Sequence, residues 1–368
     1  MSDSIRCLEF FSGIGGLHYA VNIAGVDAQV IAAFDVNEIA NKVYEHNFKK
    51  KPLNKTIERL TPNDIAKYKA DCWLLSPPCQ PYTQGGREKD CDDPRAKPLM
   101  HLIDLLPRLA DPPRYLFLEN VKNFESSQSR RKLVEQLDAL GYEIHECLLS
   151  PIQFGIPNHR LRYYLTARRC HNTQAKNDVS DSYVDRCTIN TTWPFSEEAH
   201  FELPELSIFL QPEADDDERY KVPFKDLKRL HNFRLDIVRP DSRKTSCVTK
   251  SYGSHHIMTS GSMMQTKKLE ITEYDWSNSE SLTELGLRFL TPTEIARLHA
   301  FPLEKYHEGV ISNTTSVMGG CRPFIGPTVQ PYLEFPSSVT IGQRYRLLGN
   351  SLNCWVVAEL LRCHLFQR

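Results

Sequence analysis

The chain has 368 residues, 40% of them hydrophobic and 25% charged, with a formal net charge of −1. This composition is typical of a globular protein, and no run of about 18 apolar residues predicts a membrane span. A chain this close to neutral is not expected to attract a polyanion over its whole surface, so any nucleic-acid contact would need local basic patches.

The eleven cysteines form no C-x-x-C pair, which disfavours a zinc or redox site, and we expect no metal. The first residues also lack the apolar core of a secretory signal. We therefore expect a reducing compartment, the cytoplasm or also the nucleus, and a monomer without membrane contact.

The first 170 residues alternate between short apolar runs and amphipathic stretches. The predicted strands are Cys7–Phe11, Gln29–Phe34, Cys72–Ser76, Tyr115–Glu119, Ile144–Leu149 and Arg162–Ala167. The predicted helices between them are Leu17–Ala24, Ile39–His46, Met100–Leu109 and Arg130–Leu140. This alternation predicts an α/β fold with a mostly parallel, Rossmann-like sheet and helices on both faces.

The composition of the chain changes after residue 170, where polar residues dominate and apolar runs become short. We predict a small domain at 171–286 and a larger domain formed by 1–170 and 287–368. Two further helices are predicted at Thr291–His299 and Leu352–Leu365. The stretch 309–338, rich in Gly, Pro, Ser and Thr, predicts a flexible insertion.

A glycine-rich turn follows the first predicted strand, at Phe11-Ser12-Gly13-Ile14-Gly15-Gly16. Glycines allow the backbone to approach a ligand, and Asp35 at the end of the second strand could accept hydrogen bonds from a ribose. Many such turns are only tight turns, but the spacing is not G-x-G-x-x-G, which argues against a nicotinamide cofactor. The pattern favours an adenosine-containing ligand.

Cys79 follows the third predicted strand, in Ser76-Pro77-Pro78-Cys79-Gln80. The prolines hold the backbone in a shaped loop at the carboxyl end of the strand. Spacing alone leaves a nucleophilic thiol and a free cysteine in a proline turn about equally supported.

Two further groups are predicted at the same rim of the sheet. Glu119 ends the fourth strand in Glu119-Asn120-Val121; a carboxyl there could carry a proton, although Asn120 could instead cap a following helix. Arg160 and Arg162 are two residues apart and would share one face of a strand, where a structural pair bound to carboxylates is the alternative.

In their order, these motifs together with Gly349-Asn350-Ser351 resemble the cytosine-5 methyltransferases of DNA and tRNA. The resemblance covers about residues 5–170 and 288–365. It implies that the Cys79 thiolate adds to carbon 6 of cytosine and that Glu119 binds the ring nitrogen. It further implies that Arg162, with Arg160, holds the flipped-out base.

The same resemblance implies S-adenosylmethionine as the cofactor. The residues it places around that cofactor are Phe11, Ser12, Gly13, Ile14, Gly15, Gly16, Asp35, Val36, Ile57, Glu58, Ser76, Pro77, Asn350 and Ser351.

Within the family, Cys247-Val248-Thr249-Lys250-Ser251-Tyr252 and Gln343–Ser351 are most similar to the tRNA-Asp branch, although Val248 departs from it. The resemblance implies that Cys247, Thr249, Lys250 and Tyr252 contact the anticodon loop of a tRNA. The alternatives are a DNA cytosine-5 methyltransferase and a catalytically silent nucleic-acid-binding protein. Arg130-Arg131-Lys132 is a candidate basic patch, although such runs are more often solvated surface.

Overall fold

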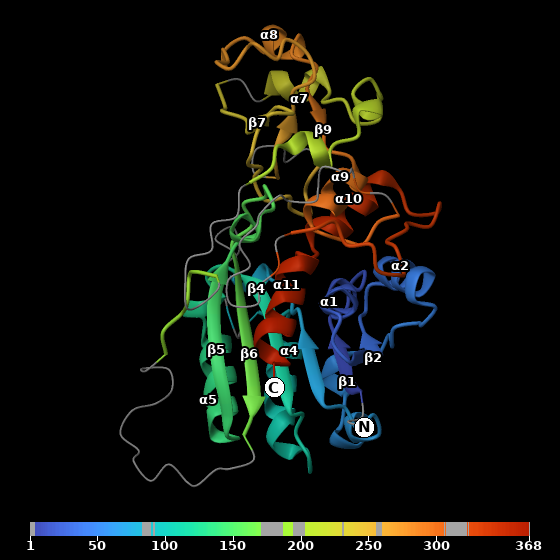
Figure 1. Ribbon diagram of the computed structural model, residues 1–368, viewed down its shortest axis with the longest axis vertical. Coiled ribbons are helices and arrows are strands. Elements are labelled where there is room, and N and C mark those ends of the chain that lie inside the picture. Colours follow the sequence, from blue (N-terminus) through green and yellow to red (C-terminus); the bar gives the residue numbers. More distant parts are fainter. Residues whose placement is uncertain are drawn as a thin grey trace.

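The computed structural model describes residues 4–82, 90, 93–170, 187–193, 203–229, 232–254, 260–304, 306, 322 and 324–367. It consists of a large α/β part and a small part stacked above it (Figure 1). No helix among these residues is both long and apolar enough to cross a lipid bilayer.

The large part is built on a six-stranded sheet with the order β2-β1-β3-β4-β6-β5. Its strands are β1 Ile5–Phe10, β2 Ala28–Phe34, β3 Cys72–Leu75, β4 Tyr115–Val121, β5 Tyr142–Leu149 and β6 Arg162–Arg169. β6 runs antiparallel to β4 and β5, and the pairs among β1 to β4 are parallel. The predicted mostly parallel α/β sheet is therefore confirmed.

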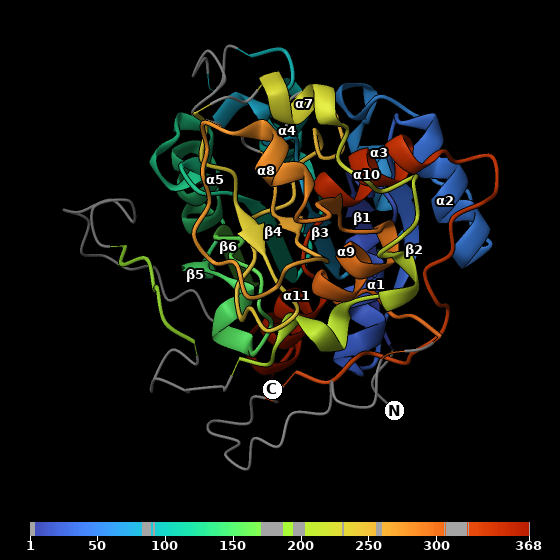
Figure 2. The same ribbon diagram turned by 90° about the horizontal axis from the view of Figure 1, so that it is seen from above.

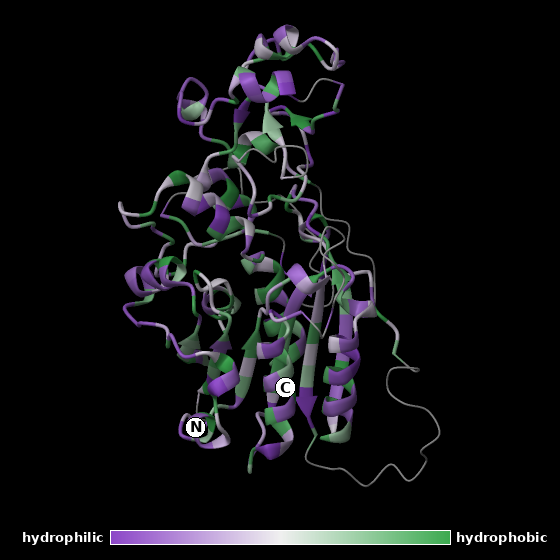
Figure 3. Ribbon diagram, turned by 180° about the vertical axis from the view of Figure 1, so that it is seen from behind, coloured by the Kyte–Doolittle hydropathy of each residue, from purple (hydrophilic) through white to green (hydrophobic). Residues whose placement is uncertain are grey.

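Helices cover both faces of this sheet, because its strands are apolar on both sides; all four residues of β3 are buried. The helices on one face are α1 Gly16–Ala24, α2 Glu38–Phe48 and α11 Cys354–Leu360. Those on the other face are α3 Pro62–Ala66, α4 Lys97–Leu105 and α5 Gln128–Ala139 (Figure 2). Coloured by hydropathy, α5 shows many hydrophilic residues, whereas the sheet between the helix layers is largely hydrophobic (Figure 3).

Short helical turns connect these elements. The 3-10 turns are Ile57–Arg59, Gln80–Tyr82, Leu106–Arg108, Phe124–Ser126, Pro151–Phe154, Leu206–Phe209 and Pro212–Ala214. A π-helical turn, Leu361–Leu365, continues α11. The predicted last helix is thus present, but it begins at Cys354, where Asn353 caps it, and all residues of α11 are buried.

The small part contains a three-stranded sheet in the order β7-β8-β9, with β7 Ile237–Val238, β8 Met263–Met264 and β9 Arg288–Phe289. Two short helices, α7 Phe224–Arg229 and α8 Ser279–Thr283, belong to it. It lies above the carboxyl ends of the parallel strands (Figures 1 and 2). β9 lies wholly beyond residue 286, where the small domain was predicted to end.

Two helices, α9 and α10, lie between the large part and the small part (Figure 1). α9 Pro292–Leu298 begins at the predicted position, with a capping box between Thr291 and Glu294. α10 Ile341–Gly349 was not predicted, and it begins with a second capping box, between Thr340 and Gln343.

The predicted insertion 309–338 lies partly outside the described residues, at 309–321 and 323. Its described remainder forms no helix or strand, yet Phe324 and Leu333 are buried. The Phe324 ring packs edge-on against Trp355 of α11, with 5.4 Å between the ring centroids. Packing therefore holds this half of the segment against the large part.

Candidate active site

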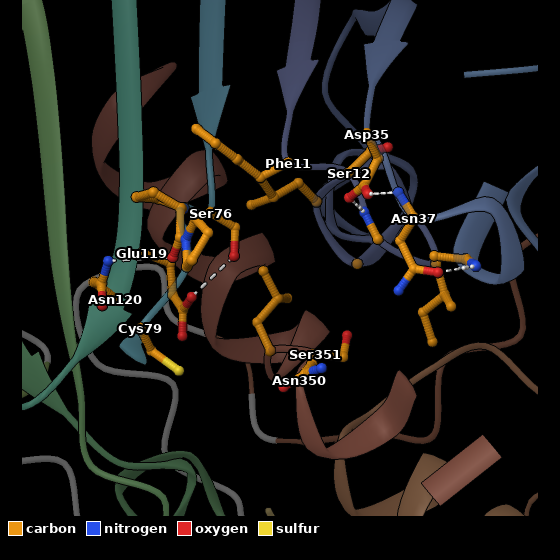
Figure 4. Close-up of a pocket in the computed structure, with 18 of the residues that line it drawn as sticks. Phe11, Ser12, Asp35, Asn37, Ser76, Cys79, Glu119, Asn120, Asn350 and Ser351 are labelled. Carbon is orange, nitrogen blue, oxygen red and sulfur yellow. Dashed lines mark hydrogen bonds between the residues drawn. The ribbon is translucent and has the colours of Figure 1, made fainter. Parts of the chain in front are cut away.

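A cavity of about 470 Å³ opens at the carboxyl ends of β1 to β4, where the sheet order switches direction between β1 and β3. Every predicted catalytic and cofactor residue lines it except Gly15. Figure 4 shows side chains from the ends of four neighbouring strands pointing into this single space.

The glycine-rich turn after β1 forms one wall of this cavity. Phe11, Gly13 and Gly15 have φ angles of 60°, 52° and 89°, so a non-glycine residue also adopts the left-handed conformation here. A Cβ on Gly15 would lie 2.4 Å from Cε2 of Phe48. Gly15 is therefore needed for the packing of the turn against α2, which explains its absence from the lining.

The Asp35 carboxylate fixes this turn to the end of β2. Gly13 N–H donates to Oδ2 at 2.7 Å, and Asn37 N–H donates to Oδ1 at 2.7 Å. Burial raises the pKa of Asp35, and the backbone hydrogen bonds oppose that rise. Each oxygen keeps lone pairs that can accept from a ligand.

Two more acceptors in this wall lack partners among the described residues. They are the buried Ser12 Oγ and Glu58 Oε2. Beside them Val36 is 62% exposed, although it is apolar. Unpartnered polar atoms next to an exposed apolar side chain fit a ligand that carries hydroxyl or amino groups on a flat ring system, such as an adenosine.

Cys79 lies at the end of the loop that follows β3. The loop is held from β4, because Asn120 Nδ2 donates to the carbonyl of Pro77 at 3.3 Å. Cys79 is a free, half-buried thiol whose sulfur points into the cavity (Figure 4). Asn120 does not cap a helix, since Ser127 caps α5, so this alternative is wrong.

Glu119 occupies the end of β4 beside this loop. Ser76 Oγ donates to its Oε2 at 3.1 Å, and Arg162 Nε lies 3.6 Å from its Oε1. Burial raises the pKa of Glu119, and Arg162, Arg160 and Ser76 oppose the rise. The carboxyl group thus holds a proton more readily than an exposed glutamate does.

Arg160 and Arg162 both line the cavity. Arg162 is the first residue of β6, whereas Arg160 precedes the strand, so the prediction that one strand carries both is wrong. Arg160 Nη1 donates to Cys247 Sγ at 3.1 Å and to the Val248 carbonyl at 3.0 Å.

The other end of the Arg160 guanidinium reaches the rim of the cofactor pocket. Arg160 Nη2 donates to the carbonyls of Gly349, at 3.4 Å, and Ser351. A Cβ on Gly349 would lie 2.2 Å from the carbonyl carbon of Thr249. Arg160 therefore joins three segments that are distant in sequence.

Sequence reasoning missed Arg95, which lines the cavity together with Gln80. Its Nε donates to Asp93 Oδ1 at 2.8 Å, and its Nη1 donates to Gln80 Oε1. The Asp93 carboxylate raises the pKa of Arg95, with a smaller contribution from Cys79. A single arginine in an irregular stretch gives no sequence signal for this proximity to the thiol.

The four residues predicted to contact substrate are not equivalent. Tyr252 is 3% exposed; its hydroxyl donates to the Ser262 carbonyl at 2.6 Å and accepts from Leu290 N–H at 2.8 Å. Because both positions are used inside the fold, the prediction that Tyr252 contacts RNA is corrected to a packing role. Lys250 is exposed and Thr249 half-buried, while Cys247 lies behind the arginines and does not line the cavity.

The fold and the cavity define a class: an α/β enzyme with a nucleoside-sized pocket, a thiol and a carboxyl group at one sheet edge. In the described part of the chain, no group of three or more His, Cys, Asp and Glu is placed to hold a metal ion. A family model described as C-5 cytosine-specific DNA methylase matches residues 5–321. The chain belongs to this family.

Relatives match over nearly the whole chain. The tRNA (cytosine(38)-C(5))-methyltransferase of Homo sapiens is 34% identical, covering 98% of this chain and 99% of the relative. The DNA (cytosine-5)-methyltransferase of Dictyostelium discoideum is 35% identical, covering 98% and 94%. The crystal structure of S. pombe Dnmt2 methyltransferase superposes with a TM-score of 0.74 at 32% identity, covering 97% of each chain.

Proposed function

We propose that the chain methylates carbon 5 of a cytosine in the anticodon loop of a tRNA, with tRNA-Asp as the expected substrate, through a covalent Cys79 adduct. The observation that carries this proposal is the shared cavity. The Cys79 thiol, the Glu119 carboxyl and Arg162 face the same space as the glycine turn and Asp35.

The side of the cavity formed by the glycine-rich turn, Asp35, Ile57 and Glu58 would hold S-adenosylmethionine. Asp35 would accept from ribose hydroxyls, Val36 and Ile57 would pack on the adenine, and Ser12 and Glu58 would gain hydrogen-bond partners that they lack. When bound, this cofactor supplies an electrophilic methyl group on a sulfonium. Asn350 and Ser351 close the opposite side of the pocket.

Cys79, Glu119 and Arg162, on the other side of the cavity, would activate the target cytosine. As the Cys79 sulfur bonds to carbon 6 of cytosine, Glu119 donates a proton to ring nitrogen 3, so that the electron pair reaches carbon 5. A buried carboxyl with a raised pKa suits this donation, because burial makes it hold a proton more readily than an exposed glutamate does. Arg162 lies beside Glu119 and would offset charge on the base oxygen.

Carbon 5 would then bond to the methyl group as the methyl–sulfonium bond breaks and a neutral thioether leaves. Loss of the carbon 5 proton to solvent would re-form the carbon 5–carbon 6 double bond and expel the Cys79 thiolate, and the proton on nitrogen 3 would return to Glu119. The target cytosine must leave its stack to reach this cavity. Lys250 is exposed on the segment that packs against Gly349 and is a candidate phosphate contact.

The preference for tRNA rests on the relatives that are named as tRNA methyltransferases and that match the chain over its full length. A relative of similar identity named as a DNA methyltransferase makes DNA the second candidate. A cytosine in tRNA and a cytosine in DNA both fit this chemistry, so the choice between the two substrates needs a direct comparison of methyl transfer to each.

The test is transfer of labelled methyl from S-adenosylmethionine to unmodified tRNA-Asp or to an unmethylated DNA duplex. Wild type, Cys79→Ala and the exposed-cysteine control Cys170→Ala are compared. We expect label on tRNA from wild type and control, and none from Cys79→Ala. Label on DNA alone would replace the substrate assignment, and label on neither, with cofactor bound, would support a silent binding protein.

A second measurement tests the adduct itself. A tRNA with 5-fluorocytosine at the target cannot lose the group at carbon 5, so the covalent complex should persist through denaturing electrophoresis. It should form with Cys170→Ala and not with Cys79→Ala. A persistent complex with Cys79→Ala would assign the nucleophile to another residue.

A further inference from the structure

Both active-site arginines point at the same sulfur atom. Arg160 Nη1 donates to Cys247 Sγ at 3.1 Å, and Arg162 Nη2 donates to it at 3.4 Å. Cys247 lies behind the arginines as seen from the cavity, since it does not line the cavity and they do. Its sulfur therefore contacts the arginines and not the substrate space.

The charges of this cluster do not balance if the thiol is neutral. Arg160 is 3% exposed, and its hydrogen-bond acceptors among the described residues are the Cys247 sulfur and three backbone carbonyls. No described carboxylate forms an ion pair with it. A buried cation without a counter-charge is strongly disfavoured, so a negative group is required beside it.

Glu119 does not supply this charge fully. It lies 3.6 Å from Arg162, and burial raises its pKa, which favours the neutral acid. His299 and Tyr164, two further titratable groups near the pair, add no charge. Burial and both arginines hold the pKa of His299 well below its usual value, and burial raises the pKa of Tyr164 far above its usual value. A Cys247 thiolate is the group that is placed to balance the pair.

The electrostatics of the thiol agree with this geometry. Burial alone would raise the pKa of Cys247, but the positive charges and hydrogen bonds of Arg160 and Arg162 outweigh it and lower the pKa. A thiolate with two guanidinium donors is a favourable charge-assisted arrangement.

We propose that Cys247 is a thiolate that serves as counter-ion and positioning residue for Arg160 and Arg162. This inference rests on the proposed function, because it assigns the support of that same site. With the thiolate neutralising the arginines, Glu119 is free to carry the proton that it donates to the base. The predicted role of Cys247 as a substrate contact is replaced by this one.

The first test needs neither a variant nor activity. Tryptic cleavage after Lys244 and Lys250 releases Thr245–Lys250, a peptide with Cys247 as its one cysteine. The folded and the denatured chain are treated with iodoacetamide over a pH series, and alkylation of this peptide is followed by mass spectrometry. We expect a lower midpoint pH for the folded chain; an equal or higher midpoint would overturn the proposal.

The second test compares Cys247→Asp with Cys247→Asn, which have the same size and differ in charge. Loss of hydrogen bonds to a charged group predicts a kcat at least about tenfold lower for Asn than for Asp, with KM for the RNA similar. Equal activities, or a more active Asn variant, would contradict the proposal. If wild type is itself inactive, the proposed function fails, while the alkylation midpoint still decides the state of Cys247.

Discussion

Glu9 in β1 offers a test of how a buried acid supports the cofactor turn. Its side chain is fully buried, and its Oε1 accepts from the backbone N–H of His18 in α1 at 3.2 Å. The Tyr44 hydroxyl lies 3.0 Å from Glu9 Oε2 and 2.7 Å from His18 Nδ1. Burial and Lys50 lower the pKa of His18 to about 3, so its ring is neutral.

Glu9 is expected to carry its proton near neutral pH. Burial raises its pKa from 4.5 to about 8, although the hydrogen bonds that the Tyr44 hydroxyl and the His18 backbone N–H donate to its carboxyl group oppose the rise. In Glu9→Gln the amide nitrogen can donate to Tyr44, and the amide oxygen can accept from His18, at every pH.

The expected effect depends on pH. A folded-state pKa above the unfolded value stabilises the fold fully below pH 4.5, and this contribution is lost as pH rises through about 8. At about 1.4 kcal/mol for each pKa unit, the free energy of unfolding of wild type should fall relative to Glu9→Gln by about 3 kcal/mol at pH 7 and by about 5 kcal/mol above pH 8.

The assay is urea unfolding of wild type and Glu9→Gln at several pH values from about 5 to 9, since the linkage acts over this window. The exposed Glu45→Gln on α2 is the matched control, and its difference from wild type should stay nearly constant. A constant difference for Glu9→Gln, or one that shifts toward wild type as pH rises, would refute the buried-acid argument.

Two further predictions concern packing and charge. Gly349→Ala places a Cβ 2.2 Å from the Thr249 carbonyl carbon; it should cost about 1–3 kcal/mol and weaken cofactor binding, and an unchanged Tm with and without cofactor would contradict this. Arg130→Met leaves the buried Glu146 carboxylate without its cation and should cost about 3–5 kcal/mol in urea unfolding. The exposed control Arg131→Met should cost under about 0.5 kcal/mol, and equal losses would be evidence against the ion-pair argument.

The central sheet could be predicted because each strand carries its own signal. Cys72–Ser76 was predicted from an apolar run, and β3 spans Cys72–Leu75. α10 was missed because arginines interrupt its apolar periodicity, although Thr340 and Gln343 show the spacing of a capping box. That local signal could have located its start.

The site, like the fold, has features that local sequence patterns predict and contacts that they do not. Cys79 and Glu119 were placed correctly in the cavity because each follows a strand, and parallel strands end at one edge. The contacts of Arg160 with Cys247 and Ser351 span 87 and 191 residues, and no local pattern encodes them. Arg130 shows the same limit: it belongs to a basic run, yet it is buried against Glu146 of β5 and is not part of a surface patch.

The position of α11 shows why the large part needs both ends of the chain. Its residues Cys354–Leu360 are all buried on the face of the sheet that carries α1. At about 1.5–3 kcal/mol for each large apolar side chain, burial of Trp355, Val356, Val357, Leu360 and Leu361 contributes about 8–15 kcal/mol. Asn350 and Ser351, which line the cofactor pocket, lie directly before α11, so residues 1–170 alone provide neither this burial nor that part of the pocket. The small part, in contrast, is inserted between two segments that fold together, and it reaches the active site through Cys247 and Thr249.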